Sequence, residues 1–240
     1  MFESLDAKFL KGQLCLICAG PGTGKSAFVL TYALKARVPT LYFSADSDAY
    51  TQLTRSVSII TGWPVDKASR LVREGDLNGA TPDMEGIPIR FNYHASPTLD
   101  QIESSMMSYE EVYGDYPALV VVDNITNVRA GGGVDDDDPF AGLEALMDYL
   151  HTMARNTSAC VVGLHHVTGK YNDGNIPIPL SGIKGQIARV PELVLTLHRV
   201  EQYNADSLRV STVKNRGGKQ DPSGMSWVGL PFDGDRMRIG

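Results

Sequence analysis

The chain has 240 residues, of which 42% are hydrophobic and 21% are charged, with a formal net charge of −6 at pH 7. This composition excludes disordered, collagen-like and disulfide-scaffold chains, and the length suits one α/β domain over residues 1–240. No apolar run approaches the roughly 20 residues of a membrane span, and no secretory signal opens the chain. Because three cysteines suit a reducing compartment, we expect a cytoplasmic protein with no membrane partner.

The acidic balance bears on nucleic-acid binding, because a passive nucleic-acid binder usually carries a large basic excess. This chain has 22 Lys and Arg against 28 Asp and Glu, and four of the acids stand together at Asp135–Asp138. Any contact with DNA is therefore expected to be local and tied to assembly.

Strand-like apolar runs alternate with helical patterns along most of the chain. Strands are predicted at Gln13–Cys18, Thr40–Ser44, Ile89–His94 (an edge strand), Ala118–Asp123 and Ala159–Leu164, and helices at Lys25–Ala36, Ala49–Thr61, from a Thr98/Gln101 capping box to about Tyr113, and at Phe140–Ala154. Three further strand-like runs, Glu192–His198, Ser207–Val213 and Met225–Leu230, follow without helices between them. This order predicts a mainly parallel central sheet flanked by helices, with antiparallel strands at the C-terminal end.

The strongest motif lies between the first predicted strand and the first predicted helix. It reads Ala19-Gly20-Pro21-Gly22-Thr23-Gly24-Lys25-Ser26 and matches the P-loop pattern, with alanine where glycine is commoner. Its glycines let backbone N–H groups turn toward phosphate oxygens, and the helix N-terminus adds positive potential. Lys25 would reach the β- and γ-phosphates and the Ser26 hydroxyl would ligate Mg²⁺, so the motif predicts binding of ATP and Mg²⁺.

A second carboxylate is expected to support the metal. Four apolar residues lead into Asp123 at the carboxyl end of a predicted strand, the end at which ligands bind in open α/β sheets. A strand-ending aspartate can also act only as a cap. Beside a P-loop, the pattern favours Asp123 as the partner of Ser26 at Mg²⁺.

Several short motifs together resemble the RecA ATPases, most closely the RecA-like motor core of DnaB-type hexameric replicative helicases. They occur in order over nearly the whole chain: Leu5-Asp6, Lys11-Gly12-Gln13-Leu14, Phe43-Ser44-Ala45-Asp46, Leu53 with Arg55, Leu164-His165-His166-Val167 and Val213-Lys214-Asn215-Arg216-Gly217-Gly218. The resemblance implies a RecA-like P-loop fold, Mg²⁺-dependent ATP hydrolysis, and a homo-oligomer that forms a hexameric ring or a filament. It also implies helicase-like action on single-stranded DNA.

The resemblance assigns roles near the γ-phosphate. Asp46 stands where the family has a glutamate that activates the attacking water, and a carboxylate there can accept that water's proton. Because aspartate is one methylene shorter, Asp48 remains a neighbouring candidate. His166 stands at the position of a γ-phosphate sensor, with His165 as the weaker alternative, and its imidazole can donate to a phosphate oxygen.

Lys214 and Arg216 match a late Lys-x-Arg motif whose side chains reach the nucleotide site of the neighbouring subunit. Two residues apart on a strand, they would point to one face. Arg216 would then be an arginine finger that stabilises charge on the transferred phosphoryl group, which implies a site completed only between subunits. An exposed basic strand end is the alternative reading.

The two loops that contact DNA in this family have few basic residues here. The predicted loop at 131–139 contains the acidic run, with only Arg129 nearby as a base, and the second loop offers Lys170 and later Lys184. Phosphate contacts dominate DNA affinity, and acidic groups oppose them. Two other functions therefore stay open: a RecA-type recombination ATPase, and an ATP-driven protein-assembly switch that does not translocate. With 18 residues before the P-loop, no N-terminal domain of the replicative helicases is expected.

Three smaller expectations concern single side chains. Cys15 and Cys18 have metal-like spacing but lie in a predicted strand, so we expect them to be buried rather than to bind zinc. Tyr42, Phe43 and the pair Met106–Met107 are expected in the core. Tyr203 is a candidate to stack on adenine.

Overall fold

The computed structural model describes residue 5 and residues 7–129, 141–184, 186–202 and 205–240. The acidic run at 135–138 and Tyr203 lie outside these residues, so the expectations placed on them stay untested. The described strands are β1 (Leu14–Ala19), β2 (Thr40–Ser44), β3 (Ile89–Asn92), β4 (Leu119–Asp123), β5 (Cys160–His166), β6 (Leu193–Gln202), β7 (Ala205–Asn215), β8 (Val228–Asp233) and β9 (Arg238–Ile239). The described helices are α1 (Lys25–Ala36), α2 (Ala49–Thr61), α3 (Val65–Glu74), α4 (Thr81–Met84), α5 (Leu99–Tyr113) and α6 (Ala141–Thr157). Short 3₁₀ turns are η2 (Ile125–Asn127), η3 (Gly169–Tyr171), η4 (Leu180–Gly182) and η5 (Gly234–Arg236).

The strands form one sheet in the order β3-β2-β4-β5-β1-β6-β7-β8-β9. All pairs from β3 to β6 are parallel, and the pairs from β6 to β9 are antiparallel. Strands β1, β2 and β4 are buried along their whole length, as expected for parallel strands covered by helices on both faces. The predicted mixed α/β architecture is therefore confirmed.

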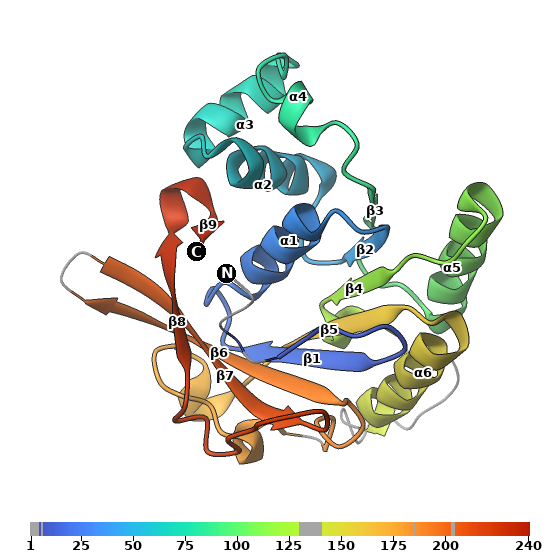
Figure 1. The fold of residues 1–240 in the computed structure, drawn as a ribbon, viewed down its shortest axis with the longest axis vertical. Helices are drawn as coiled ribbons and strands as arrows, with labels where there is room; N and C mark the ends of the chain where they lie inside the picture. Colours follow the sequence, from blue (N-terminus) through green and yellow to red (C-terminus); the bar gives the residue numbers. More distant parts are fainter. Residues whose placement is uncertain (1–4, 6, 130–140, 185, 203–204) are drawn as a thin grey trace.

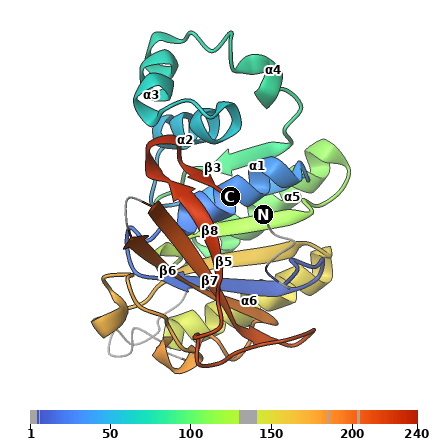
Figure 2. The same ribbon diagram turned by 60° about the vertical axis from the view of Figure 1, so that its left-hand side comes forward.

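Helices cover the two faces of the sheet separately (Figure 1). One core holds α1 residues such as Phe28 and Leu34 with inward side chains of β1, β5, β7 and β8. The other core holds Ile102 of α5 and Leu146 of α6 against the opposite face. Helices α2, α3 and α4 extend beyond α1, where α3 and α4 form their own small cluster with α2 (Figure 2).

Most predicted elements are confirmed, and the differences have local causes. Strands β6 and β7 run further than predicted because their outer ends are polar, so apolar content alone underestimates them. The last long strand begins at Val228 rather than Met225, because the Asp221 carboxylate accepts hydrogen bonds from the Ser223 and Ser226 backbone N–H groups and fixes a turn. Helices α3 and α4 and the short strand β9 were not predicted.

The core expectations are mostly confirmed. Cys15, Cys18, Tyr42 and Phe43 are all buried. Of the methionine pair, Met106 is buried, whereas Met107 is 58% exposed because it lies one position round the α5 surface. No helix in the described part of the chain is long and apolar enough to span a membrane.

Candidate functional site

The candidate site lies at the carboxyl ends of four adjacent parallel strands. In the order β2-β4-β5-β1, these ends carry Asp46 just after β2, Asp123 at the end of β4, His166 at the end of β5 and the P-loop after β1. The backbone continues this adjacency, because the Val167 N–H donates to the Ala19 carbonyl at 3.1 Å and the Ala45 N–H donates to the Asp123 carbonyl at 2.8 Å. Sheet topology thus brings together residues up to 147 positions apart in the predicted set, from Ala19 to His166.

The P-loop has the backbone shape that its glycines predict. Gly22 and Gly24 have φ of 70° and 112°, in the region that side chains other than glycine rarely adopt, and α1 begins at Lys25. A Cβ on Gly20 would lie 2.3 Å from the Asn172 carbonyl oxygen. The turn after β5 therefore packs directly on the P-loop, a contact that the motif alone does not reveal.

Lys25, His166 and Asp46 form a chain of polar contacts across the strand ends. The Lys25 ammonium donates to the Ala19 and Gly20 carbonyls, both at 3.0 Å, and approaches His166 Nδ1 at 2.9 Å. Because Nδ1 accepts from the ammonium, the proton of a neutral His166 lies on Nε2, which faces Asp46 Oδ2 at 3.6 Å. A base candidate and a sensor candidate are therefore both linked to the P-loop lysine.

Burial shifts the pKa of these groups. It lowers the pKa of Lys25 to about 8, against the opposing charges of Asp123 and Asp46. Burial and the Lys25 charge lower the pKa of His166, which favours its neutral form, while Asp46 opposes the shift. A bound phosphate would add negative charge beside the Lys25 ammonium and so would stabilise its charged form.

Two asparagines hold the Asp46 carboxylate. Asn124 donates to Oδ2 at 2.8 Å and Asn127 donates to Oδ1 at 2.9 Å, both from the segment that follows β4. Asp48 instead caps α2, where its carboxylate accepts from the Thr51 N–H at 2.8 Å. The two candidates for the base thus have different partners, and only Asp46 contacts His166.

Asp123 and Ser26 meet beside Lys25. The Tyr42 hydroxyl donates to Asp123 Oδ2 at 2.9 Å, and burial raises the pKa of Asp123 while its hydrogen bonds to Ser26 and Tyr42 oppose the rise. A hydroxyl and a carboxylate are the hard oxygen donors that Mg²⁺ prefers. Among the described residues no three His, Cys, Asp or Glu gather into a metal cluster, so an ion here would depend on nucleotide oxygens and water as well.

His165 lies on the buried side of the same strand end. Its side chain is 5% exposed, and burial, His166 and Lys25 together lower its pKa to about 4. Its Nδ1 has no hydrogen-bond partner in the part of the chain that the structure describes. A cavity of about 330 Å³ lies beside both histidines, and its lining includes Thr126, Thr168 and Lys184.

An aromatic–cation stack borders the P-loop on its other side. The Arg199 guanidinium lies 4.6 Å from the centre of the Phe232 ring, and that ring would be 3.9 Å from a Cβ on Gly24. Both residues line a groove of about 700 Å³. Neither residue belongs to a recognised short motif, and only the pairing of β6–β8 brings them to the P-loop.

Lys214 and Arg216 lie beside the start of β1, at the edge of the sheet formed by the amino ends of the parallel strands (the amino-end edge). The P-loop lies at the edge formed by their carboxyl ends (the carboxyl-end edge). Asn215 pairs with Leu193, which pairs with Cys15 near the start of β1, whereas the P-loop follows the end of β1. Six residues of β1 separate the two edges by about 20 Å. Arg216 lies just beyond β7 rather than on it, yet both side chains donate to the Arg189 carbonyl, at 2.7 Å from Lys214 and 3.1 Å from Arg216.

Sequence reasoning missed the residues that orient the predicted ones. Tyr42 was predicted only as core, and Asn124, Asn127, Arg199 and Phe232 were not considered. The one available signal was the position of Asn124 and Asn127 immediately after the strand that ends in Asp123.

Comparisons with known proteins agree with this fold. The chain is 65% identical over 244 aligned residues to the Gene 65 protein of Mycobacterium phage L5, covering 100% of this chain and 91% of that protein. It is 23% identical to the replicative DNA helicase DnaB of Treponema pallidum, covering 90% of this chain and 50% of that protein. A solved DnaB-like replicative helicase matches with a TM-score of 0.78 at 16% identity over 96% of this chain and 57% of that chain, so the fold is RecA-like.

The model of one family, the DnaB-like helicase C-terminal domain, matches residues 1–232. The match covers the P-loop, the strand ends with Asp46, Asp123 and His166, and the late Lys214–Arg216 segment. The chain belongs to the DnaB-like helicase C-terminal domain family.

Proposed function

We propose that the chain is one RecA-like ATPase domain that hydrolyses ATP with Mg²⁺ and works in a homo-oligomer on single-stranded DNA. The observation that carries the proposal is the chain of contacts from Lys25 through His166 to Asp46, beside the Ser26–Asp123 pair. A P-loop that only binds nucleotide needs no carboxylate held by two asparagines opposite its lysine.

Each side chain has a defined task in this proposal. Lys25 would release the Ala19 and Gly20 carbonyls and place its charge on the β- and γ-phosphates. Asp46, oriented by Asn124 and Asn127, would accept a proton from the attacking water. Ser26 and Asp123 would together hold Mg²⁺, which supplies positive charge beside the phosphates when bound.

The nucleobase would lie on the Arg199–Phe232 stack. Phosphates on the P-loop direct the rest of the nucleotide outward past Gly24, and the groove of about 700 Å³ there is lined by these two side chains. Cations and aromatic rings both stack on the face of a purine. This contact would hold the base without reading its edges.

The position of Arg216 supports a site shared between subunits. It lies about one strand length from its own P-loop, a distance that an arginine side chain cannot span. Its side chain is 53% exposed, as expected for a group offered to a neighbour. A ring or filament in which this edge meets the next P-loop would complete the site.

Binding of single-stranded DNA would use the ends of β4 and β5. Lys170 and Lys184 follow β5, and Lys184 lines the cavity that also contacts both histidines. His166 would thereby link bound DNA to the γ-phosphate. This route is consistent with the few basic residues, because it requires contacts at a few phosphates only.

The deciding experiment is the ATPase rate with and without single-stranded DNA over a range of salt concentrations, followed by strand displacement. Stimulation that weakens with salt, together with displacement, supports the helicase-like motor. Stimulation without displacement would favour a RecA-type recombination ATPase. An ATPase that DNA never stimulates would favour the protein-assembly switch, an outcome that the acidic run at 135–138 makes worth testing.

A further inference from the structure

A buried carboxylate occupies the edge of the sheet that carries Lys214 and Arg216. Glu192 immediately precedes β6 and is 8% exposed. Its Oε2 accepts a hydrogen bond from the Leu14 N–H at 3.0 Å, and the Glu192 N–H donates to the Leu14 carbonyl at 3.0 Å. Glu192 is therefore fixed to the first residue of β1, the strand that leads to the P-loop.

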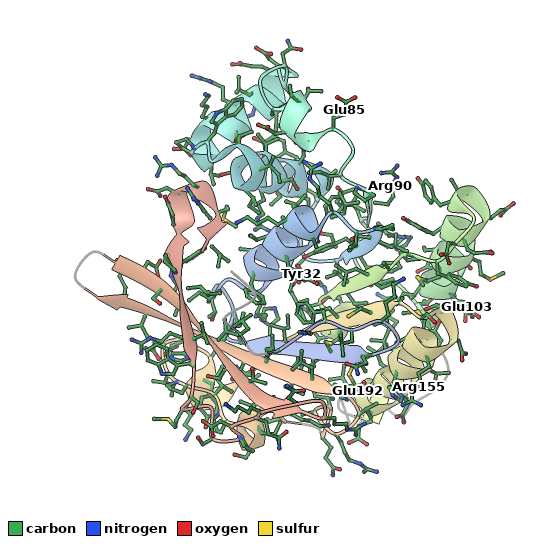
Figure 3. The ribbon with its side chains drawn as sticks, in the orientation of Figure 1. Tyr32, Glu85, Arg90, Glu103, Arg155 and Glu192 are labelled. Atoms are coloured by element: carbon green, nitrogen blue, oxygen red, sulfur yellow. The ribbon has the colours of Figure 1, made fainter. Side chains whose placement is uncertain are left out.

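The other oxygen of this carboxylate faces two arginines and a histidine. Glu192 Oε1 lies 3.8 Å from Arg216 NH1, 3.9 Å from Arg155 NH2 and 2.9 Å from His151 Nε2. Arg155 and His151 belong to α6, and Figure 3 shows Arg155 and Glu192 side by side below that helix. Among the described ion pairs, Glu192 is the single carboxylate that pairs with either arginine.

The backbone around Glu192 also holds the Lys-x-Arg segment. The Arg216 N–H donates to the Glu192 carbonyl at 3.0 Å. The Lys214 ammonium donates to the Ala188 and Arg189 carbonyls at 2.8 and 2.7 Å, and the Arg216 guanidinium donates to the Arg189 carbonyl. The segment from 188 to 192 thus supplies the backbone carbonyls that bind both Lys214 and Arg216.

We propose that Glu192 is a positioning residue for Arg216: its carboxylate, fixed to β1, sets where the guanidinium stands at the edge that the next subunit would meet. The inference rests on the proposed role of Arg216 in trans. The neutral Arg189 carbonyl holds the guanidinium through one nitrogen, whereas the carboxylate places a negative charge near a second nitrogen. Without it, the Arg216 and Arg155 guanidinium groups would face each other with no carboxylate between them, and Arg216 would turn toward solvent.

The test uses Glu192→Gln, which keeps an oxygen acceptor for the Leu14 N–H and removes the charge. We expect kcat of the assembled protein to fall about 10- to 100-fold, because displacement of about 1 Å at a reacting group costs this much. ATP affinity should stay close to that of the wild type, because the P-loop lies at the other edge. Glu103→Gln, an exposed change on α5, is the matched control and should keep wild-type kcat.

Mixed oligomers give a measurement that a general structural defect would not reproduce. Glu192→Gln mixed with Lys25→Ala should regain activity, since the first supplies an intact P-loop and the second an intact Arg216. Glu192→Gln mixed with Arg216→Ala should not regain activity, because both have the same defective edge. Glu192→Asp, which keeps the charge but shortens the side chain, should give the same pattern and replaces the glutamine variant if that variant does not bind ATP.

The outcomes separate this inference from the function on which it rests. No rescue between Arg216→Ala and Lys25→Ala would mean that the shared site itself is wrong. Rescue of that pair, together with wild-type kcat for Glu192→Gln, would overturn the role of Glu192 alone. An equal kcat loss in His151→Gln, which leaves the Arg216 contacts in place, would also overturn it, because the effect would then pass through α6.

Discussion

The two edges of the central sheet hold their lysines in the same way but surround them differently. Lys25 donates to two consecutive backbone carbonyls at the carboxyl-end edge, and Lys214 does the same at the amino-end edge. Burial lowers the pKa of each to about 8. However, Lys25 also contacts His166, which in turn faces Asp46. Lys214 instead lies beside Arg216, whose side chain is 53% exposed.

This difference indicates which edge could bind nucleotide without the other. The carboxyl-end edge holds a lysine, a base candidate and the paired oxygens of Ser26 and Asp123 within one chain. The amino-end edge presents cations without a phosphate-binding backbone. If the edges are two halves of one site, damage to either should stop hydrolysis, but only damage to the first should weaken binding of nucleotide.

The largest effect is expected for Lys25→Ala. It removes the mobile charge aimed at the phosphates, so ATP binding should weaken strongly and hydrolysis should fall to the level of a protein-free control. Nucleotide binding and steady-state phosphate release measure the two effects. Hydrolysis at the wild-type rate would mean that the P-loop is not the site.

Arg216→Ala should come next, with a loss of about 10³-fold in hydrolysis and nearly unchanged ATP affinity. Mixing this variant with Lys25→Ala should restore part of the activity that neither shows alone, and the rescue should disappear on dilution below the assembly concentration. Failure to rescue in assemblies shown to be mixed would place Arg216 in a structural role within its own chain.

The fold was largely predictable because its parallel strands are short apolar runs with helices between them. The predicted limits of Lys25–Ala36, Thr40–Ser44 and Ala49–Thr61 match α1, β2 and α2. Helix α3 was missed because it is short and six of its ten residues are polar or charged, although its few apolar residues fall on one face. The full lengths of β6 and β7 were underestimated for the same reason, because their outer ends are polar.

The site was predictable residue by residue but not as a network. The P-loop motif predicts Lys25 and Ser26, and a strand ending in a carboxylate predicts Asp123. The contact between Lys25 and His166 spans 141 positions and depends on β5 lying beside β1, an order that local patterns do not encode. The same holds for the Arg199–Phe232 stack, which needs the antiparallel pairing of β6 to β8.

Asp46→Asn should slow hydrolysis by about 100-fold and leave ATP affinity nearly intact, because it removes a proton acceptor without removing a phosphate contact. Asp48→Asn is the matched control two residues away. Asparagine caps a helix as well as aspartate does, so α2 and hydrolysis should both be preserved. Single-turnover rates at saturating ATP compare the two, and a larger loss at residue 48 would transfer the role of base to Asp48.

The pH dependence of ATP binding should separate the two lysines. Phosphate binds the charged form of Lys25, whose pKa is about 8, so affinity should fall about tenfold between pH 7 and pH 9. Lys25→Arg stays charged and should flatten the profile, although it binds more weakly. Lys214→Met should keep the wild-type profile, because that lysine lies at the other edge; a flattened profile there would contradict the separation of the edges.

The smallest effect is expected at the nucleobase. Phe232→Leu keeps an apolar side chain beside Gly24 but removes the ring under Arg199, so ATP affinity should weaken about fivefold, or about 1 kcal/mol. Inorganic tripolyphosphate has no base, so its affinity should not change. Tyr93→Leu, an exposed aromatic just beyond β3, should change neither affinity. Equal losses for ATP and tripolyphosphate would show that Phe232 only supports the P-loop, and the base would then have to lie elsewhere along the carboxyl-end edge.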